Sequence, residues 1–200
     1  MNREYLPRPD KETIRSLPAF PGLSLDQVII LQTPDDLKRA ESELAMVTQV
    51  GFDTETKPVF LANQPKSGPH LIQLATDSLA ILCPATYEPG LDLLRGIIPS
   101  ESVMKVGFGL KSDRGPLQRL LGVTLRGSQE LSGLVQQLGY QQKVGLQTAV
   151  AVVLGQHLQK SKRVTTSNWA APALSKSQIL YAANDAYASL RIHQALQKRS

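Results

Sequence analysis

The chain has 200 residues, of which 42% are hydrophobic, enough for one substantial core. Its formal net charge of +5 is compatible with a polyanionic partner without requiring one. A single cysteine, Cys83, excludes an internal disulfide, and no apolar stretch approaches the ~20 residues that span a bilayer, so we expect a cytoplasmic protein without membrane association.

The chain is expected to begin with an arm. Residues 1–23 carry four prolines among charged and small residues, and we interpret them as an extended arm that precedes a single domain over residues 24–200. The compact part should start with a short strand over residues 28–31. A helix should follow, because Thr33 is a good cap residue and a proline and two acids come next; it should run to about Val47.

Further elements follow from the spacing of apolar residues. Strands are predicted over residues 49–56, 71–76, 79–83 and 103–108. A helix is predicted over residues 91–98, and from residue 112 onward the apolar spacing is helical, around residues 117–121, 131–138, 146–154 and 175–197. We therefore predict an α/β fold in which an early sheet is covered by helices, with a helix-rich C-terminal half.

Four carboxylates and one phenol lie in three otherwise apolar stretches. A strand's period of two places Asp53 and Glu55 on one face. A spacing of four places Tyr181 and Asp185 on one side of the last predicted helix, about one turn apart. Asp113 follows the predicted strand over residues 103–108. Each piece alone is more often a solvated pair or a helix-start residue, but together they predict one site.

Carboxylates gathered in this way are the ligands of two-metal sites, which activate water and stabilise charge on phosphorus. Asp53, Glu55, Asp113 and Asp185 would bind two divalent ions. Oxygen ligands favour Mg²⁺ or Mn²⁺ over zinc, for which the sequence has no His or Cys cluster. A phenol titrates near ~10, so Tyr181 would stay protonated at neutral pH and orient the attacking water.

These segments resemble the three motifs of the DEDD superfamily of 3′-5′ exonucleases. The tyrosine resembles the subgroup typified by ribonuclease D and the Werner exonuclease domain. The similarity extends over about residues 25–197 and is carried by Gly51-Phe52-Asp53-Thr54-Glu55-Thr56-Lys57-Pro58, Val106-Gly107-Phe108-Gly109-Leu110-Lys111-Ser112-Asp113 and Tyr181-Ala182-Ala183-Asn184-Asp185-Ala186-Tyr187.

The resemblance implies a ribonuclease-H-like mixed β-sheet flanked by α-helices. It also implies hydrolysis of phosphodiester bonds from a free 3′ end of DNA or RNA, with release of nucleoside 5′-monophosphates. By the same resemblance Asp53, Glu55 and Asp185 would hold one ion, Asp53 would share the second with Asp113 acting largely through water, and Tyr181 would be the water-orienting residue. Trp169 is interpreted as a packing residue behind the last helix.

Two departures from the family pattern lie between the second and third motifs. Glu130 stands in a segment where relatives often carry an Asp-Leu pair, and Pro116 is expected in the first turn of the helix that carries Asp113, where proline is tolerated. The alternative function is a nuclease fold that binds nucleic acid or protein without cutting. A phosphate-binding loop at Gly107 and Gly109 is disfavoured, because neither fingerprint is complete.

Overall fold

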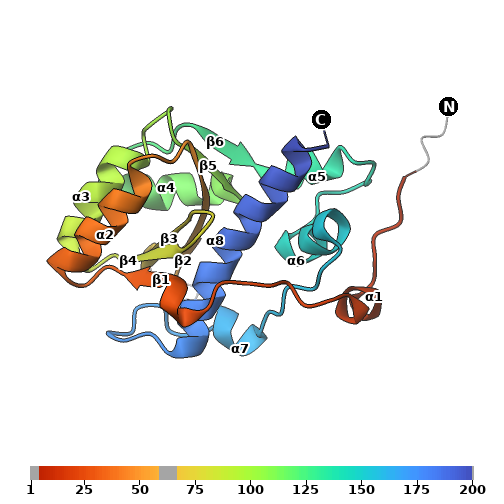
Figure 1. The fold of residues 1–200 in the computed structure, drawn as a ribbon, viewed down its shortest axis with the longest axis horizontal. Coiled ribbons are helices and arrows are strands. Elements are labelled where there is room, and N and C mark those ends of the chain that lie inside the picture. The colour runs from red at the N-terminus through yellow and green to blue at the C-terminus, as the bar shows by residue number, and fades with distance from the viewer. Residues whose placement is uncertain (1–4, 59–66, 200) are drawn as a thin grey trace.

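The fold was analysed in a computed structural model that describes residues 5–58 and 67–199. Within these ranges six strands form one mixed sheet in the order β1-β4-β3-β2-β5-β6 (Figure 1). The strands are β1 (Val28–Ile30), β2 (Gln49–Glu55), β3 (Leu71–Ala75), β4 (Ala80–Pro84), β5 (Met104–Gly107) and β6 (Ser128–Glu130). β3 is antiparallel to both of its neighbours, and the other pairs are parallel. β2 therefore lies in the interior of the sheet, between β3 and β5.

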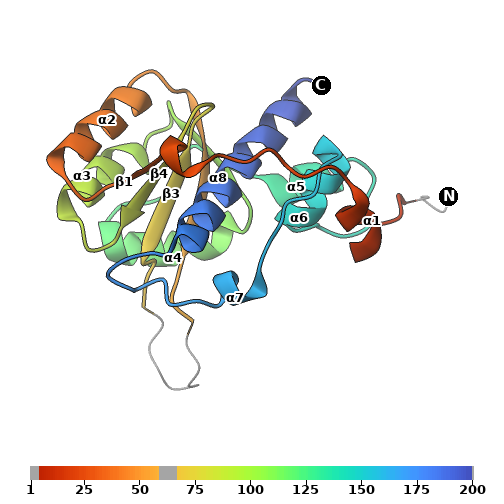
Figure 2. The ribbon, with the colours of Figure 1, turned by 60° about the horizontal axis from the view of Figure 1, so that its bottom comes forward.

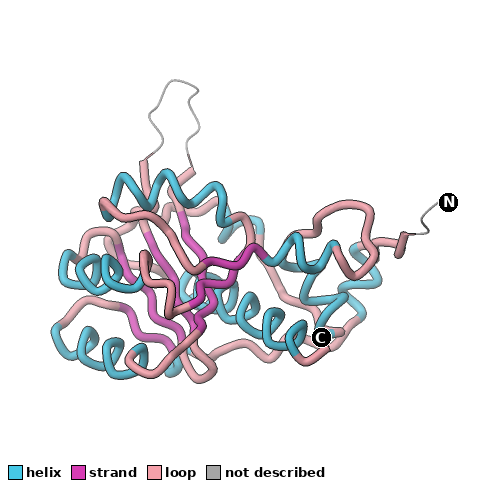
Figure 3. The backbone as a smooth tube through the Cα atoms, turned by 90° about the horizontal axis from the view of Figure 1, so that it is seen from above, coloured by secondary structure: helices cyan, strands magenta, loops and turns pink. Residues whose placement is uncertain are grey.

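Helices lie on both sides of these strands (Figure 3). They are α1 (Lys11–Ser16), α2 (Pro34–Leu44), α3 (Glu88–Ile97), α4 (Leu110–Leu121), α5 (Leu131–Gln136), α6 (Leu146–Ala149), α7 (Lys162–Thr165) and α8 (Lys176–Gln197). A 3₁₀ turn (Leu25–Gln27) precedes β1, and a π-helical turn (Val150–Leu154) follows α6. Capping boxes begin α2 at Thr33 and α8 at Ser175. In the described ranges no helix is long and apolar enough to cross a bilayer.

The alternation of side chains gives the sheet two apolar faces. Phe52, Ile72 and Leu74 pack on one side against α2, α3 and α4. Leu71 and Ala75 point to the other side and pack against α8. Because successive residues of a strand face opposite sides, Asp53 and Glu55 share the α8 side, whereas Thr54 shares the side of Phe52.

α8 lies unusually close to β2. A Cβ added at Gly51 would stand 1.9 Å from the carbonyl oxygen of Ala186, so only glycine fits there. The facing side of α8 is also small, with fully buried Ala182, Ala183 and Ala186. This close approach brings residues of α8 next to the acidic residues of β2.

Residues 5–23 of the N-terminal arm are held against the rest of the chain (Figure 2). The N–H of Phe20 donates to the carbonyl of His157 at 2.9 Å, and the N–H of His157 donates to the carbonyl of Pro18 at 2.8 Å. The N–H of Leu23 donates to Asn184 Oδ1 at 2.6 Å, in α8. The arm is not extended throughout, because residues 11–16 form α1 with Asp10 as its cap.

The predicted strands and the longer helices are confirmed, with shifts of a few residues at their ends. Besides α1 in the arm, three features differ. β6 lies in a segment for which only helical spacing was expected, and α7 was not predicted. Pro116 lies beyond the first turn of α4, and the helix continues through it, so its expected place in the first turn was wrong.

Candidate active site

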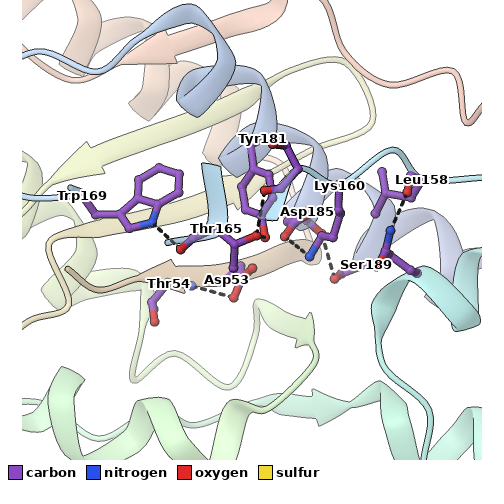
Figure 4. Close-up of polar contacts among 11 residues, drawn as sticks. Asp53, Thr54, Leu158, Lys160, Thr165, Trp169, Tyr181, Asp185 and Ser189 are labelled. Atoms are coloured by element: carbon purple, nitrogen blue, oxygen red, sulfur yellow. Dashed lines mark hydrogen bonds and ion pairs between the residues drawn. The ribbon is translucent and has the colours of Figure 1, made fainter. Parts of the chain in front are cut away.

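Three of the predicted acidic residues meet where β2 and α8 are in contact. Ligand oxygens of Asp53, Glu55 and Asp185 all lie within 4.8 Å of one another. Asp53 and Glu55 reach this point from the α8 side of β2, and Asp185 reaches it from α8 (Figure 4 shows Asp53 and Asp185). We call these three residues the acidic centre. Carboxylate oxygens at this spacing suit a hard divalent cation such as Mg²⁺ or Mn²⁺.

Asp113 approaches from the opposite side of the sheet. Thr54 Oγ1 donates to Asp113 Oδ1 at 2.9 Å, while the backbone N–H of the same threonine donates to Asp53 Oδ1 at 2.9 Å. One residue of β2 therefore links the two carboxylates. Asp113 is not one of the three mutually close acids, which agrees with a more peripheral position in the site.

Glu130, one of the two departures from the family pattern, supports the helix that carries Asp113. The N–H of Leu110, at the start of α4, donates to Glu130 Oε2 at 3.0 Å. The other carboxylate oxygen accepts from the N–H of Ser132 at 3.1 Å and so caps α5. One carboxylate at the end of β6 thus satisfies backbone donors of two helices.

The position of the Tyr181 side chain is fixed by contacts with Thr165 and Trp169. Thr165 Oγ1 donates to the phenol oxygen at 3.0 Å, and the Trp169 ring lies with its centroid 5.9 Å from that of Tyr181 (Figure 4). Trp169 is only 2% exposed, and its indole N–H donates to the carbonyl of Thr165 at 3.3 Å, as expected of a packing residue. Burial raises the pKa of Tyr181 above its ordinary value, so the phenol stays protonated at neutral pH.

Lys160 is a site residue that the sequence did not predict. Its ammonium forms an ion pair with Asp185 Oδ2 and lies 5.0 Å from the centroid of the Tyr181 ring (Figure 4). In the sequence it belongs to a basic run with Lys162 and Arg163, which is typical of a solvated surface. One signal in the sequence could have indicated an inward-facing lysine. Lys160 lies two residues after Leu158, which is buried, and in an extended segment residues two apart face the same side.

Burial, together with the crowding of carboxyl groups, dominates the electrostatics of the site. Burial, followed by the charge of Asp185, raises the pKa of Asp53 to about 8, against the opposing effect of Lys160. Burial, followed by the charge of Asp53, raises the pKa of Glu55 to about 9. Burial also raises the pKa of Asp185, opposed by Lys160, and raises that of Asp113 to about 6, opposed by the bond from Thr54. The carboxyl groups therefore share protons when no metal is bound, and they would release these protons when a divalent cation binds.

A buried amide stands beside the acidic centre. Gln73 is opposite Asp53 in the β2–β3 register and is fully buried. Neither polar atom of its side chain has a hydrogen-bond partner in the described part of the chain. Cross-strand neighbours in a sheet have Cβ atoms roughly 5 Å apart, so this amide is a polar neighbour of the Asp53 carboxylate.

Comparison with known proteins gives consistent results. Residues 28–200 match the model of a family described as 3′-5′ exonuclease. A 3′-5′ exonuclease of Arabidopsis thaliana is 32% identical over 164 residues, which cover 81% of this chain and 56% of that protein. The bifunctional 3′-5′ exonuclease/ATP-dependent helicase WRN of Mus musculus is 33% identical over 153 residues, covering 74% of this chain and 11% of that protein. The chain thus spans about half, or less, of the length of these relatives.

Solved structures share the fold. The EXO domain of Aedes aegypti Nibbler superposes with a TM-score of 0.74 at 24% identity, covering 88% of this chain and 90% of that one. Escherichia coli RNase D superposes with a TM-score of 0.70 at 21% identity, covering 84% of this chain and 44% of that one. The predicted α/β class, with a ribonuclease-H-like mixed sheet flanked by helices, is confirmed.

Proposed function

Because the chain belongs to the 3′-5′ exonuclease family, we propose that it hydrolyses the terminal phosphodiester bond at a free 3′ end of DNA or RNA with the help of two divalent ions, Mg²⁺ or Mn²⁺. The observation that supports this most directly is the meeting of Asp53, Glu55 and Asp185 within 4.8 Å, with Asp113 tied to the same strand through Thr54. The relatives span more than this chain, so substrates of the whole protein are part of the proposal.

The proposed reaction is an in-line displacement on phosphorus. A water oxygen bonds to phosphorus while the bond from phosphorus to the 3′ oxygen of the preceding nucleotide breaks. A proton released by the attacking water passes through solvent to that oxygen, which becomes the new 3′-hydroxyl, and the last nucleotide leaves as a nucleoside 5′-monophosphate. The bound ions would lower the pKa of the water and neutralise charge on the phosphate.

The residues have distinct roles in this proposal. Asp53, Glu55 and Asp185 would hold one ion, and Asp53 and Asp113 would hold the second. Tyr181, protonated and fixed by Thr165, would orient the attacking water through its hydroxyl, which would place the chain in the tyrosine subgroup. Trp169 would keep the phenol in place without contacting the substrate.

The test is an assay on matched 5′-labelled oligonucleotides. Single-stranded RNA, single-stranded DNA and a duplex with a recessed 3′ end are incubated with Mg²⁺ or Mn²⁺, and we expect shortening by one nucleotide at a time with release of 5′-monophosphates. Asp53→Asn should abolish the shortening. Asp35→Asn, the same chemical change at an exposed position in α2, should leave it intact.

The second candidate function is a binding module without catalysis. The presence of all four carboxylates argues against it, because a fold that only binds has no need of a mutually repelling acidic centre. If the wild-type protein with metal leaves every 3′ end intact but still binds the oligonucleotides, the binding module is the better description.

A further inference from the structure

Lys160 places a positive charge directly on the acidic centre. Its side chain is 22% exposed and that of Asp185 is 4% exposed, so the ion pair between them is largely shielded from water. We propose that Lys160 is an internal cation that neutralises the acidic centre when no divalent ion is bound, and that a divalent ion must displace its ammonium from Asp185. This inference rests on the proposed metal dependence.

The need for such a cation follows from the geometry. Three carboxyl groups lie within 4.8 Å of one another, and like charges at that separation repel strongly in a partly buried site. Among the described residues, the ion pair from Lys160 is the one salt bridge that reaches any of the three. The ammonium offsets the charge of Asp185, the carboxylate that it contacts.

The type of side chain suits displacement. A lysine ammonium is a compact charge on a flexible four-carbon stem, whereas an arginine would form a fixed two-pronged contact. In the same position the ammonium lies 5.0 Å from the centroid of the Tyr181 ring, a neutral partner that it can keep when the ion pair breaks. A cavity of about 370 Å³ lies beside this segment and is lined by Gln159, Ser161, Tyr181 and Asp185 among others.

The backbone of this segment is anchored close to the lysine. His157 is bonded on both sides to the arm, and Leu158 is buried. The base of the Lys160 side chain is therefore fixed near the acidic centre while its end can move. This arrangement is expected of a cation that leaves and returns, because it stays close to Asp185 in both positions.

The first test measures metal affinity. Lys160→Met keeps most of the stem beside the Tyr181 ring and removes the charge. Lys162→Met makes the same change in net charge at an exposed position two residues away. Calorimetric titration with Mn²⁺ at pH 8 should show about tenfold tighter binding by Lys160→Met than by wild type, because no cation has to be displaced. Lys162→Met should bind like wild type.

The outcomes separate the proposals. Equal or weaker Mn²⁺ binding by Lys160→Met overturns the inference, including the case in which the variant only raises KM for nucleic acid, as expected of a phosphate contact. If wild type binds no Mn²⁺, the proposed function fails and the inference fails with it. If wild type binds Mn²⁺ and degrades 3′ ends but Lys160→Met binds no more tightly, only the inference fails.

A second measurement uses the wild-type protein and decides the matter if Lys160→Met does not fold. An amine-reactive acylating reagent is applied with and without saturating Mn²⁺, and labelling at each lysine is followed by mass spectrometry. We expect Mn²⁺ to increase labelling at Lys160 severalfold, because the ammonium has left its ion pair, with Lys162 unchanged as the internal reference. Equal labelling of Lys160 in both conditions contradicts displacement.

Discussion

The hydroxyl of Tyr181 can be removed without disturbing the ring that positions it. Tyr181→Phe keeps the packing on Trp169 and the face beside Lys160. We expect kcat to fall about 10²-fold, because the attacking water loses its orienting group, while Mn²⁺ affinity and KM stay unchanged. Single-turnover degradation of a 5′-labelled oligonucleotide measures this directly.

The control lies on the same helix. Tyr187→Phe removes a phenol that accepts a hydrogen bond from Arg191 and has its ring against Phe20, away from the acidic centre. It should leave kcat unchanged. Full activity of Tyr181→Phe would remove Tyr181 from the mechanism.

The carboxyl groups of the acidic centre predict an unusual pH dependence for the metal-free protein. The pKa values of Asp53 and Glu55 are raised from 3.8 to about 8 and from 4.5 to about 9. At neutral pH the folded state therefore holds protons that the unfolded state has released, and the free energy of unfolding falls as pH rises, by at most about 1.4 kcal/mol per unit for each group. Unfolding by urea with chelator should show this loss between pH 6.5 and 8.

The upper end of this pH range is set by a lysine. Above pH 8 burial of Lys105, which lowers its pKa to about 8, adds a trend of opposite sign. Glu55→Gln removes one raised carboxyl group and should flatten the slope within the window. A free energy of unfolding that does not fall with pH over this range in the wild type would show that the carboxyls are ionised in the metal-free protein.

At the scale of elements, the contact between β2 and α8 sets the position of the acidic centre. Gly51→Ala would place a methyl group against the Ala186 carbonyl, where no space exists. We expect a loss of about 1–3 kcal/mol in the free energy of unfolding and a fall in activity, because α8 must move away from β2. Denaturant unfolding and the oligonucleotide assay measure the two effects.

Gly96→Ala is the matched control in α3, because a Cβ there would meet no atom of the described residues within 4 Å. This substitution should stabilise the protein by about 0.5–1 kcal/mol, the usual gain from replacing glycine inside a helix. If Gly51→Ala behaved in the same way, the close approach would not be a requirement of the fold.

The elements that could be predicted from sequence are those with strong local patterns. β2 carries β-branched and aromatic residues, β3 is mostly aliphatic, and α2 begins with a capping box, so each was recognisable without its neighbours. β6 is three polar residues, and it is a strand only because Ser128, Gln129 and Glu130 pair with β5. No local period reports such a pairing.

The residues of the candidate site also divide into those that could be predicted from sequence and those that could not. Asp53, Glu55 and Asp185 could be placed together from spacing, because each lies on a regular element whose facing side is known. Lys160 could not be placed at the site from its spacing, because it lies in an irregular segment whose course is set by bonds to the distant N-terminal arm. The bond from Thr54 to Asp113 was also hidden, because it depends on α4 lying on the opposite side of β2.

At the scale of the whole molecule, the arm connects segments that are far apart in sequence. Asn184, next to Asp185 in α8, accepts from the N–H of Leu23 and donates to its carbonyl. Asn184→Ala should cost about 1–3 kcal/mol of unfolding free energy for these two bonds and should speed proteolytic cleavage within the arm. Thermal unfolding and limited proteolysis measure both effects.

Asn168→Ala is a suitable comparison, because this asparagine is exposed and, among the residues that the structure describes, its side chain bonds only to the nearby N–H of Ala170. It should leave cleavage of the arm unchanged. Equal protease resistance of Asn184→Ala and wild type would mean that the remaining contacts, such as that between Phe20 and Tyr187, hold the arm without help.

β2 has two faces with different tasks, since Asp53 and Glu55 point to α8 while Phe52 and Thr54 point to α2, α3 and α4. Inserting one residue before Phe52 would exchange the faces, turning the phenylalanine toward α8 and two carboxylates into the apolar core. A substitution in β2 changes the contacts of one side chain. An insertion of one residue turns every following side chain of the strand to the wrong face. The number of residues in this strand is therefore as strict a requirement for the site as their chemical identity.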